Sequence, residues 1–332
     1  KIDKEAMVYG AISGMVKALN DPYTVFMAPE EAKKFKDDVS GSFEGIGAEI
    51  GIRKNILTII SPLKDSPAEK AGLRAGDKIL KINDTMTAEL TVDEAVSLIR
   101  GPKGTEVILY ITRDGLEKAK EIKITRGLIS IPTAKFEMKD GNIAYIALYH
   151  FYGNSSSELR NALREALLAG AQGMVLDLRN NPGGLLDVSI DIASIFLPVG
   201  EIVVSEDFGN GQKVDHKSYG PGVLKDLPMV VLTNEGSASA SEILAGALRD
   251  VRGIQLIGGK TFGKGSVQKL EDMERGASLK VTIAKWLTPK GYSISDGGLQ
   301  PDIEVNITDE DMENDRDPQL DKALEIIKTF KK

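Results

Sequence analysis

The second half of the chain alternates short apolar runs with segments whose apolar residues recur at helical spacing. From Ile129 onward this pattern predicts an α/β fold. The expected strands are 143–148, 174–178, 202–205, 229–232, 255–258 and 279–287, and the expected helices are 157–168, 187–196 and a segment after Ser239. Because the central strands are continuously apolar, we expect a sheet that is covered on both faces.

The first 128 residues follow two other patterns. Residues 1–36 place Met7, Ile12, Met15 and Leu19 on one stripe and predict a pair of helices. Residues 37–128 instead form short alternating segments, which predict strands at 47–52, 56–60, 78–82, 107–113 and 121–126. One helix interrupts them, beginning after Thr91 as N-cap and ending before 101–102. The predicted domains are therefore 1–36, 37–128 and 129–332, and the third ends in an acidic connector at 309–317 and a final helix.

The segment from Ser66 to Asn83, SPAEKAGLRAGDKILKIN, closely resembles the signature of a bacterial PDZ domain. The resemblance implies a mainly-β module that binds a peptide C-terminus as an added strand and holds its carboxylate with backbone N–H groups. The corresponding loop consists of Gly45, Ile46, Gly47 and Ala48, in which the glycines let several N–H groups point at one anion. Arg100, near the end of the following helix, could clamp the carboxylate or merely complement the helix dipole, and both readings stay open.

A serine-rich segment joins an apolar strand to an apolar helix in the predicted core. It reads TNEGSASASE from Thr233 to Glu242, and TFGKGSVQ follows from Thr261 to Gln268. The first N–H groups of a helix lack intrahelical partners and the helix dipole favours negative charge, as an acyl-transfer intermediate requires. Lys264, between two glycines, is the candidate base. An ordinary lysine, with a pKa of about 10.4, must be desolvated to accept a proton near neutral pH.

Three serines compete for the role of nucleophile, and residue type alone does not choose between them. Ser237 could cap the helix, and Ser241 would fall in its first turn, which leaves Ser239 as the third candidate. A Ser-His-Asp triad needs a histidine, but the chain has only His150 and His216, and neither adjoins these segments. Both are better interpreted as satisfied or solvent-facing side chains.

Four motifs of the second half jointly resemble the catalytic core of the C-terminal processing proteases, Ser-Lys hydrolases of a ClpP/crotonase-like fold. They are DLRNNPGG at 177–184, GSASASE at 236–242, FGKG at 262–265 and WLTP at 286–289. The order of helices, PDZ domain and core also matches that family. The resemblance implies that Ser239 is the nucleophile, Lys264 the general base and Gln268 the residue that positions the lysine. It also implies an oxyanion hole made by the backbone N–H groups of Gly184 and Ala240.

Composition and charge narrow the expected partners. A net charge of −7 without a long basic run disfavours nucleic acid, and the absence of cysteine excludes disulfides and thiol chemistry. The segment GGKT at 258–261 resembles a phosphate-binding loop, but five residues rather than four separate Gly253 from Gly259, so no nucleotide is expected. Asp177, Glu235 and Glu242 do not form a convincing metal or glycosidase set. We expect no metal and no cofactor, and substrates that are proteins or peptides with a free C-terminal carboxylate.

Two functional classes remain after these exclusions. The first is a serine endopeptidase whose PDZ domain captures substrate tails and gates access to Ser239, with hinges near 37–41 and 126–131. The alternative is a PDZ-containing binding or scaffold protein with a silent core, which the retained serine, lysine and glutamine disfavour. The resemblance implies a location in the bacterial periplasm or cell envelope, or in the thylakoid lumen of a phototroph. No signal peptide or long apolar run occurs in the sequence, so we expect that any such segment has been removed. The N-terminal helices could support a homo-oligomer.

Overall fold

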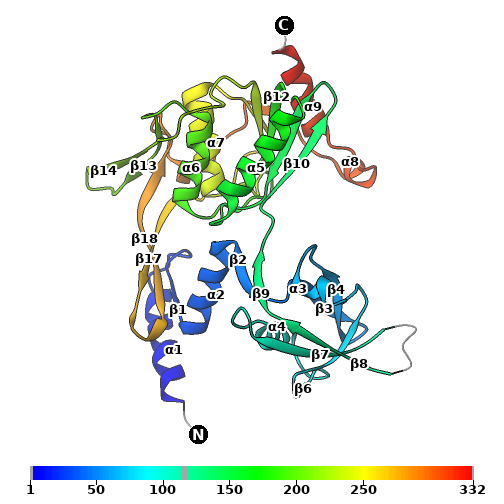
Figure 1. The fold of residues 1–332 in the computed structure, drawn as a ribbon. Coiled ribbons are helices and arrows are strands. Elements are labelled where there is room, and N and C mark those ends of the chain that lie inside the picture. Colours follow the sequence, from blue (N-terminus) through cyan, green and yellow to red (C-terminus); the bar gives the residue numbers. More distant parts are fainter. Residues whose placement is uncertain (1–2, 114–117, 331–332) are drawn as a thin grey trace. The chain divides into compact units, whose positions relative to one another are not determined.

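The computed structural model describes residues 3–113 and 118–330. The chain forms two compact units, one made of the segments up to Gly41 and from Pro132 onward, the other of Ser42–Ile131 (Figure 1). These borders lie a few residues beyond the predicted 37 and 128, for two reasons. Helix α2 (Pro29–Ser40) continues to Ser40, where Gly41 ends it in a left-handed conformation. Strand β9 (Gly127–Ser130) pairs with β2 (Ser42–Gly45) and so belongs to the smaller unit.

The larger unit is built on a six-stranded sheet in the order β10-β11-β12-β15-β16-β19. Strands β10 and β11 are antiparallel, and the other neighbours are parallel. The strands are β10 (Ala134–Lys139), β11 (Ile143–Leu148), β12 (Gly173–Asp177), β15 (Met229–Thr233), β16 (Leu256–Gly258) and β19 (Ile303–Glu304). The predicted α/β core is confirmed, and its apolar central strands lie where the sequence placed them.

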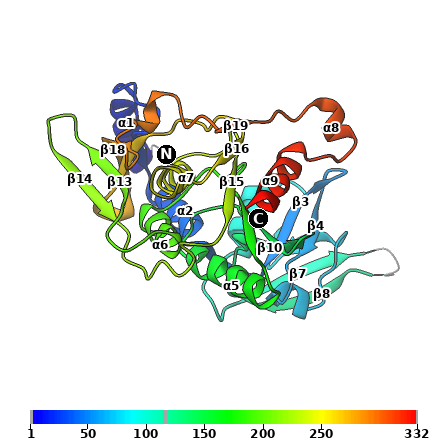
Figure 2. The same ribbon diagram turned by 90° about the horizontal axis from the view of Figure 1, so that it is seen from above.

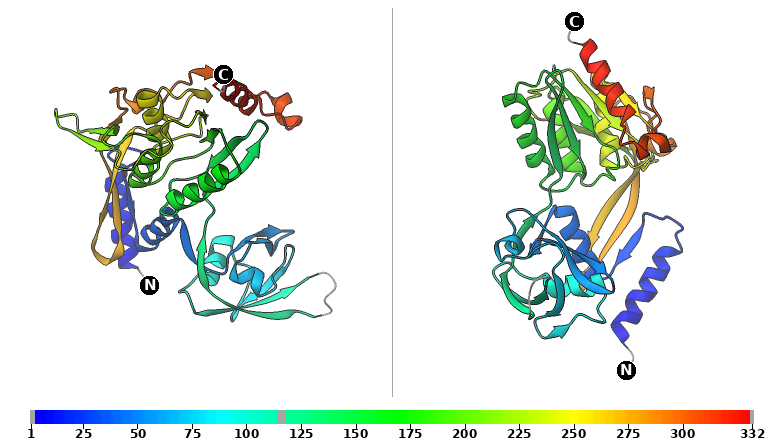
Figure 3. Two further views of the ribbon diagram at one scale, coloured as in Figure 1. Left: turned by 45° about the horizontal axis from the view of Figure 1, so that its top comes forward. Right: turned by 90° about the vertical axis from the view of Figure 1, so that its right-hand side faces the viewer.

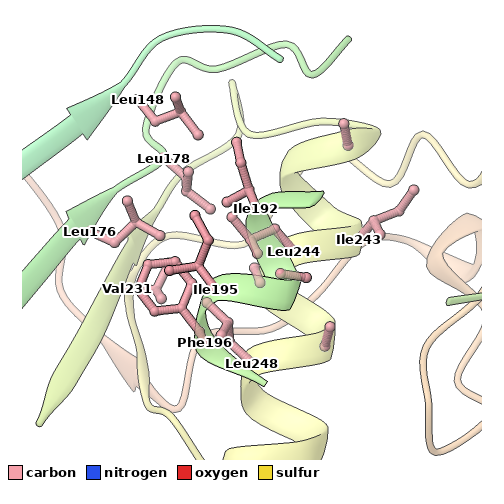
Figure 4. Packing of buried hydrophobic residues seen from close by; sticks show 14 of the residues in the cluster. Leu148, Leu176, Leu178, Ile192, Ile195, Phe196, Val231, Ile243, Leu244 and Leu248 are labelled. Atoms are coloured by element: carbon pink, nitrogen blue, oxygen red, sulfur yellow. The ribbon is translucent and has the colours of Figure 1, made fainter. Parts of the chain in front are cut away.

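Helices cover both faces of this sheet, which explains why its strands are apolar at every position. Helices α5 (Ser155–Leu168), α6 (Leu186–Phe196) and α7 (Ala240–Arg252) lie on one face, and α9 (Pro318–Thr329) lies on the other (Figure 3). Alternate residues of one strand face opposite ways: Met229 and Val231 pack toward α6 and α7, whereas Val230 and Leu232 pack toward α9. Figure 4 shows the hydrophobic residues that pack between the sheet and helices α6 and α7. Those that are fully buried include Leu176, Leu178, Ile192, Phe196, Val231, Leu244 and Leu248.

A second sheet flanks this core beside α7 (Figure 2). Its order is β1-β18-β13-β14, and β17 also pairs with β18. The strands are β1 (Val25–Met27), β13 (Ile202–Asp207), β14 (Lys213–Lys217), β17 (Ser266–Asp272) and β18 (Ser278–Leu287). Residues 1–36 contain the predicted pair of helices, but strand β1 separates the two. It lies between α1 (Lys4–Lys17) and α2, pairs antiparallel with β18, and buries Phe26 and Met27, so the N-terminal segment is part of the core unit.

The smaller unit has the strand order β3-β4-β5-β7-β8, with β6 on β5. Its elements are β3 (Ala48–Arg53), β4 (Ile56–Pro62), α3 (Pro67–Lys70), β5 (Lys78–Ile82), β6 (Thr85–Met86), α4 (Val92–Ile99), β7 (Glu106–Thr112) and β8 (Lys120–Thr125). Thr91 caps α4 as predicted, because its hydroxyl accepts from the N–H of Glu94 and the Glu94 carboxylate accepts from the N–H of Thr91. Strand β3 is an edge strand, with α4 packed against it.

The acidic segment before the last helix is more ordered than the connector that the sequence predicted. Thr308 caps a short helix, α8 (Asp309–Glu313), and Asp317 binds the guanidinium of Arg179 at 2.7 Å. Arg179 also binds Asp177 at the end of β12, so this partly buried arginine anchors the start of α9 to the sheet. The short helices η1 (Glu274–Gly276) and η2 (Ile294–Asp296) complete the unit. Within the described residues, no helix is long and apolar enough to cross a membrane.

Candidate active site

Ser239 occupies the turn between β15 and α7 in a strained backbone conformation. Its φ of 56° and ψ of −117° fall outside the regions that residues with a side chain normally adopt. Helix α7 begins at the next residue, Ala240, so Ser239 is the N-cap of a helix whose body is buried. Such strain persists only where the surroundings hold it, and it is concentrated at functional sites.

The other two serines of the motif hold this turn in place. The hydroxyl of Ser237 donates to the carbonyl of Leu178 at 2.8 Å, and that of Ser241 donates to the carbonyl of Asn181 at 2.9 Å. Both side chains are fully buried, whereas Ser239 is partly exposed. Ser237 is therefore not the helix cap that the sequence allowed. Of the three competing serines, Ser239 is the one that is not buried.

The glycines that follow Pro182 pass against the serine turn too closely for a side chain. A Cβ on Gly183 would lie 2.8 Å from both the Ser239 Cβ and the Ala240 nitrogen, and one on Gly184 would collide with the carbonyl oxygen of Phe151. The amide of Asn181 supports the loop, accepting from the N–H of Gly183 at 2.9 Å and donating to the carbonyl of Leu148 at 2.7 Å. These close approaches leave room for glycine alone at both positions.

Two backbone N–H groups are unused where this loop meets the helix. The N–H of Phe151 donates to the carbonyl of Gly183, and the N–H of Leu185 donates to the carbonyl of Phe151. The N–H of Gly184, between these two bonds, donates to no acceptor in the described part of the chain. The N–H of Ala240, the first of helix α7, likewise has no acceptor among the described residues. The two donors predicted for the oxyanion hole thus have no acceptor within the described residues.

The carboxylate of Glu242 joins the serine turn to the lysine loop. It accepts from the N–H of Ser239 at 2.9 Å, from the N–H groups of Gly263 and Lys264 at 2.7 and 3.0 Å, and from the hydroxyl of Thr261 at 2.5 Å. The residue is fully buried. Burial raises the pKa of its carboxyl group, and the four hydrogen bonds act in the opposite direction.

Sequence reasoning missed this role of Glu242, which it considered only as part of a metal or glycosidase set. A signal was present, because Ser239 and Glu242 have the S-x-x-E spacing in which the carboxylate turns back to the N–H of the capping residue. The bonds to Thr261, Gly263 and Lys264 join segments that are far apart in sequence, and spacing does not predict them.

Lys264 is partly buried, and the net effect of its surroundings is to lower its pKa. Burial lowers the pKa of Lys264, the charge of Lys280 lowers it further, and Glu242 opposes both. The ammonium nitrogen lies 5.4 Å from the centroid of the Tyr23 ring, so the N-terminal segment covers the lysine. Its neighbour Gly265 packs directly against the backbone of Ser295, where a Cβ would have no room.

The proton-transfer contacts themselves are not formed in this conformation. Among the described residues, no hydrogen bond joins Ser239 to Lys264 or Lys264 to Gln268. The Gln268 amide instead donates from Nε2 to the hydroxyls of Thr282 at 2.8 Å and Ser266 at 3.3 Å, and its Oε1 is buried without a partner. Glu242 brings Ser239 and the Lys264 backbone together, while the side chains stay apart.

The two histidines have other partners. The ring of His150 stacks on that of Tyr152 with centroids 4.5 Å apart, and burial lowers the pKa of His150. His216 lies 3.1 Å from the carboxylate of Glu206. Within the described chain, neither histidine has a hydrogen bond to Ser239.

The loop proposed to bind a peptide carboxylate lies in the smaller unit next to Arg100. Gly47 has a positive φ of 73°, and the side chain of Ile46 is buried, so only the backbone of Ile46 is available to a ligand. The Arg100 guanidinium stacks on the Phe43 ring at 4.4 Å, and a Cβ on Gly45 would lie 3.7 Å from the Arg100 Cγ. Arg100 therefore borders the loop, as the sequence suggested.

Comparison with known proteins places these units in families. Residues 142–305 match peptidase family S41, residues 58–113 match the PDZ domain family, and residues 1–31 match the N-terminal domain of the activating protease CtpB. The carboxy-terminal processing protease CtpA of Bacillus subtilis is 41% identical over 309 residues, which cover 93% of this chain and 66% of that protein. A probable CtpA-like serine protease of Staphylococcus haemolyticus is 43% identical over 296 residues, which cover 89% of this chain and 59% of that protein. The chain thus spans less than two thirds of these curated relatives.

Solved structures agree with this placement. The photosystem II D1 C-terminal processing protease is 30% identical with a TM-score of 0.56, and the match covers 92% of this chain and 83% of that one. A putative S41 protease from Bacteroides fragilis is 20% identical with a TM-score of 0.53, and the match covers 99% of this chain and 91% of that one. This likeness supports the fold. The resemblance that the motifs indicated is confirmed: the chain belongs to peptidase family S41, among the C-terminal processing proteases that carry a PDZ domain.

Proposed function

We propose that this protein is a serine endopeptidase that cleaves proteins near their C-termini, with Ser239 as nucleophile and Lys264 as general base. One observation carries the proposal. A strained, accessible serine at a helix N-terminus is tied through Glu242 to the loop of a lysine whose pKa burial lowers. This is the arrangement that an amine base for a serine hydroxyl requires, because an ordinary lysine is protonated near neutral pH.

The proposed reaction proceeds through an acyl-enzyme. The neutral Lys264 amine takes the proton of the Ser239 hydroxyl as Oγ attacks the carbonyl carbon of the scissile peptide bond. The free N–H groups of Gly184 and Ala240 receive the oxyanion of the tetrahedral intermediate. Lys264 then gives its proton to the leaving amine, and the same lysine activates the water that hydrolyses the ester. Gln268 orients the lysine by hydrogen bonding, and as a neutral amide it does not hold the proton there.

Under this proposal the structure corresponds to a resting conformation, because the hydrogen bonds between Ser239 and Lys264 and between Lys264 and Gln268 are not formed among the described residues. Catalytic hydrogen bonds are often long without substrate and shorten when it binds. We propose that the closing step is linked to capture of a substrate tail by the PDZ domain, which would be a two-state switch.

We further propose that the PDZ unit binds the free C-terminal carboxylate of protein substrates. Edge strand β3 offers unpaired backbone groups to an added strand, and α4 lines the same side. The backbone of 45–48 would hold the carboxylate, with Arg100 beside it. Such tail recognition would restrict the protease to selected chains.

Helix α1 supports a proposal about assembly. None of its residues is buried, and Met7, Val8 and Met15 are 64%, 55% and 75% exposed. We propose that α1 joins two copies of the chain, since an apolar helix surface of this kind is typical of an interface.

A location outside the cytoplasm, in the bacterial periplasm or cell envelope, is proposed from the family likeness alone. Fractionation of cells that express the full-length protein tests it, and recovery of the protein in the cytoplasmic fraction would contradict it.

A fluorophosphonate probe tests the nucleophile and base. We expect covalent labelling of the wild-type protein that Ser239→Ala and Lys264→Ala each abolish, because one removes the attacking oxygen and the other its base. Lys269→Ala is the matched control, since this exposed lysine of β17 forms its ion pair with Glu271 at the surface, and labelling should stay normal. If the wild-type protein is not labelled, the scaffold alternative is favoured instead.

The pH dependence of labelling tests the protonation state of Lys264. The reactive form carries a neutral amine, so the rate should increase toward mildly alkaline pH as Lys264 loses its proton. Lys280→Gln removes a nearby positive charge, which raises the pKa of Lys264, so the increase should move to higher pH. Lys269→Gln should leave the profile in place. A flat rate from about pH 6 to pH 9 would rule out a deprotonating lysine.

Peptide binding by fluorescence anisotropy tests the tail-reading role. A peptide with a free C-terminus should bind at least about tenfold more tightly than its C-terminal amide, because only the carboxylate makes charge-assisted hydrogen bonds. Arg100→Ala should weaken binding of the free-acid peptide selectively, whereas Arg74→Ala, exposed elsewhere in the unit, should not. An equal loss for both peptides would favour the helix-dipole role of Arg100.

If replacing residues 42–131 by a linker changes neither cleavage rate nor tail dependence, the proposed gating is wrong.

Light scattering after size exclusion tests assembly through α1. The wild-type protein should have the mass of an oligomer, and Met15→Glu should shift it toward the monomer because the charge would be buried at the interface. Lys4→Glu, at the solvated start of the helix, is the control. A monomeric wild-type protein would contradict the proposal.

A further inference from the structure

A chain of hydrogen bonds connects Gln268 to the turn between α1 and β1. Gln268 Nε2 donates to the Thr282 hydroxyl at 2.8 Å, and that hydroxyl donates to the Asp21 carboxylate at 2.5 Å. Thr282 lies directly opposite Gln268 in the β17–β18 ladder. Thr24 completes the cluster, because its hydroxyl donates to Asp21 at 2.6 Å and accepts from the N–H of Thr282 at 3.1 Å. The turn and β18 therefore meet at the Asp21 carboxylate, and β17 is connected to it through Thr282.

The charge on Asp21 determines the direction of every bond in this chain. The hydroxyls of Thr24 and Thr282 lower the pKa of Asp21, so the carboxylate is ionised and can only accept. Thr282 has a single hydroxyl proton, and it points at Asp21. The Thr282 oxygen can then only accept from its other neighbour, so the Gln268 atom that faces it must be the NH₂ group. A flipped amide would place two acceptor oxygens against each other.

This direction leaves the Gln268 carbonyl oxygen available on the opposite side of the amide. Oε1 is buried and has no hydrogen-bond partner within the described residues, although a buried acceptor is normally satisfied. An N–H donor is what it lacks, and the amine of Lys264, four residues earlier, is the donor that the proposed mechanism supplies. The same turn also reaches the lysine directly through the Tyr23 ring.

We propose that Asp21 and Thr282 are positioning residues of the Ser-Lys site, which set the Gln268 amide so that its Oε1 receives an N–H of Lys264. The inference rests on the proposed function of Ser239 and Lys264. It gives the N-terminal segment a role in catalysis, because Asp21 and Tyr23 precede β1 and are held at the site by the pairing of β1 with β18. The carboxylate acts through two intervening side chains and does not touch the reacting atoms.

The test is the second-order rate of fluorophosphonate labelling, measured together with the melting temperature. Thr282→Val removes the hydroxyl at nearly constant volume and should slow labelling about tenfold, the equivalent of one hydrogen bond. Thr282→Ser retains the hydroxyl and should restore the wild-type rate. Asp21→Asn should also slow labelling, because its NH₂ can face Thr282 and release the hydroxyl proton toward Gln268. Ser278→Ala is the matched control on β18, since it removes a hydroxyl bond to Asp272 without reaching Gln268, and its rate should be unchanged.

A double-mutant cycle separates positioning from a general loss of stability. If Thr282 acts through Gln268, then Thr282→Val should have no further effect once Gln268→Ala is present. The proposal is overturned if the two effects multiply, if Thr282→Val labels at the wild-type rate, or if Thr282→Ser is as slow as Thr282→Val. It is also overturned if Gln268→Ala alone labels normally. Each of these outcomes requires a wild-type protein that is labelled, whereas absence of labelling in the wild type contradicts the Ser-Lys assignment itself.

Discussion

The buried carboxylate of Glu242 is the interaction on which the geometry of the candidate site depends. Removing a carboxylate from water is costly unless its oxygens are hydrogen-bonded, and here four donors converge on them. One donor is the N–H of Ser239, and two others belong to Gly263 and Lys264. The same group thus sets the helix N-terminus that carries the nucleophile and the path of the loop that carries the base. Ser237, Ser241 and the glycines after Pro182 hold the turn from the other side.

The pKa of Lys264 depends on its burial and on the charges around it. Desolvation and the neighbouring Lys280 favour the neutral amine, whereas Glu242 favours the ammonium. The Tyr23 ring lies over the nitrogen and also favours the charged form. Because these influences come from the N-terminal turn, the β17–β18 hairpin and helix α7, the site exists only when all three are assembled. The pairing of β1 with β18 holds the N-terminal turn in this assembly.

Much of this arrangement could be predicted from the sequence, because much of it follows from local pattern. Apolar strands that face both ways, the Thr91 cap and the glycines around the serine turn each leave a signal within a few residues. Strand β1 gave no such signal in the sequence, because three residues are too few to show an alternation of apolar and polar positions. Its partner β18 is also far away in sequence. The partners of Glu242 and Gln268 were missed for the same reason. The choice of Ser239 over Ser237 came from a family resemblance, and the bond from Ser237 to Leu178 supplies its physical explanation.

The central claim is that Lys264 can be a neutral amine near physiological pH, and a titration of that side chain tests it most directly. NMR of protein carrying ¹³C-labelled lysine, with the Lys264 signal assigned by comparison with Lys264→Arg, reports the pKa of the amine. The account predicts a pKa for Lys264 clearly below that of the exposed lysines in the same sample, and an increase when Lys280 is replaced by Gln. A Lys264 signal that titrates together with the exposed lysines would contradict it.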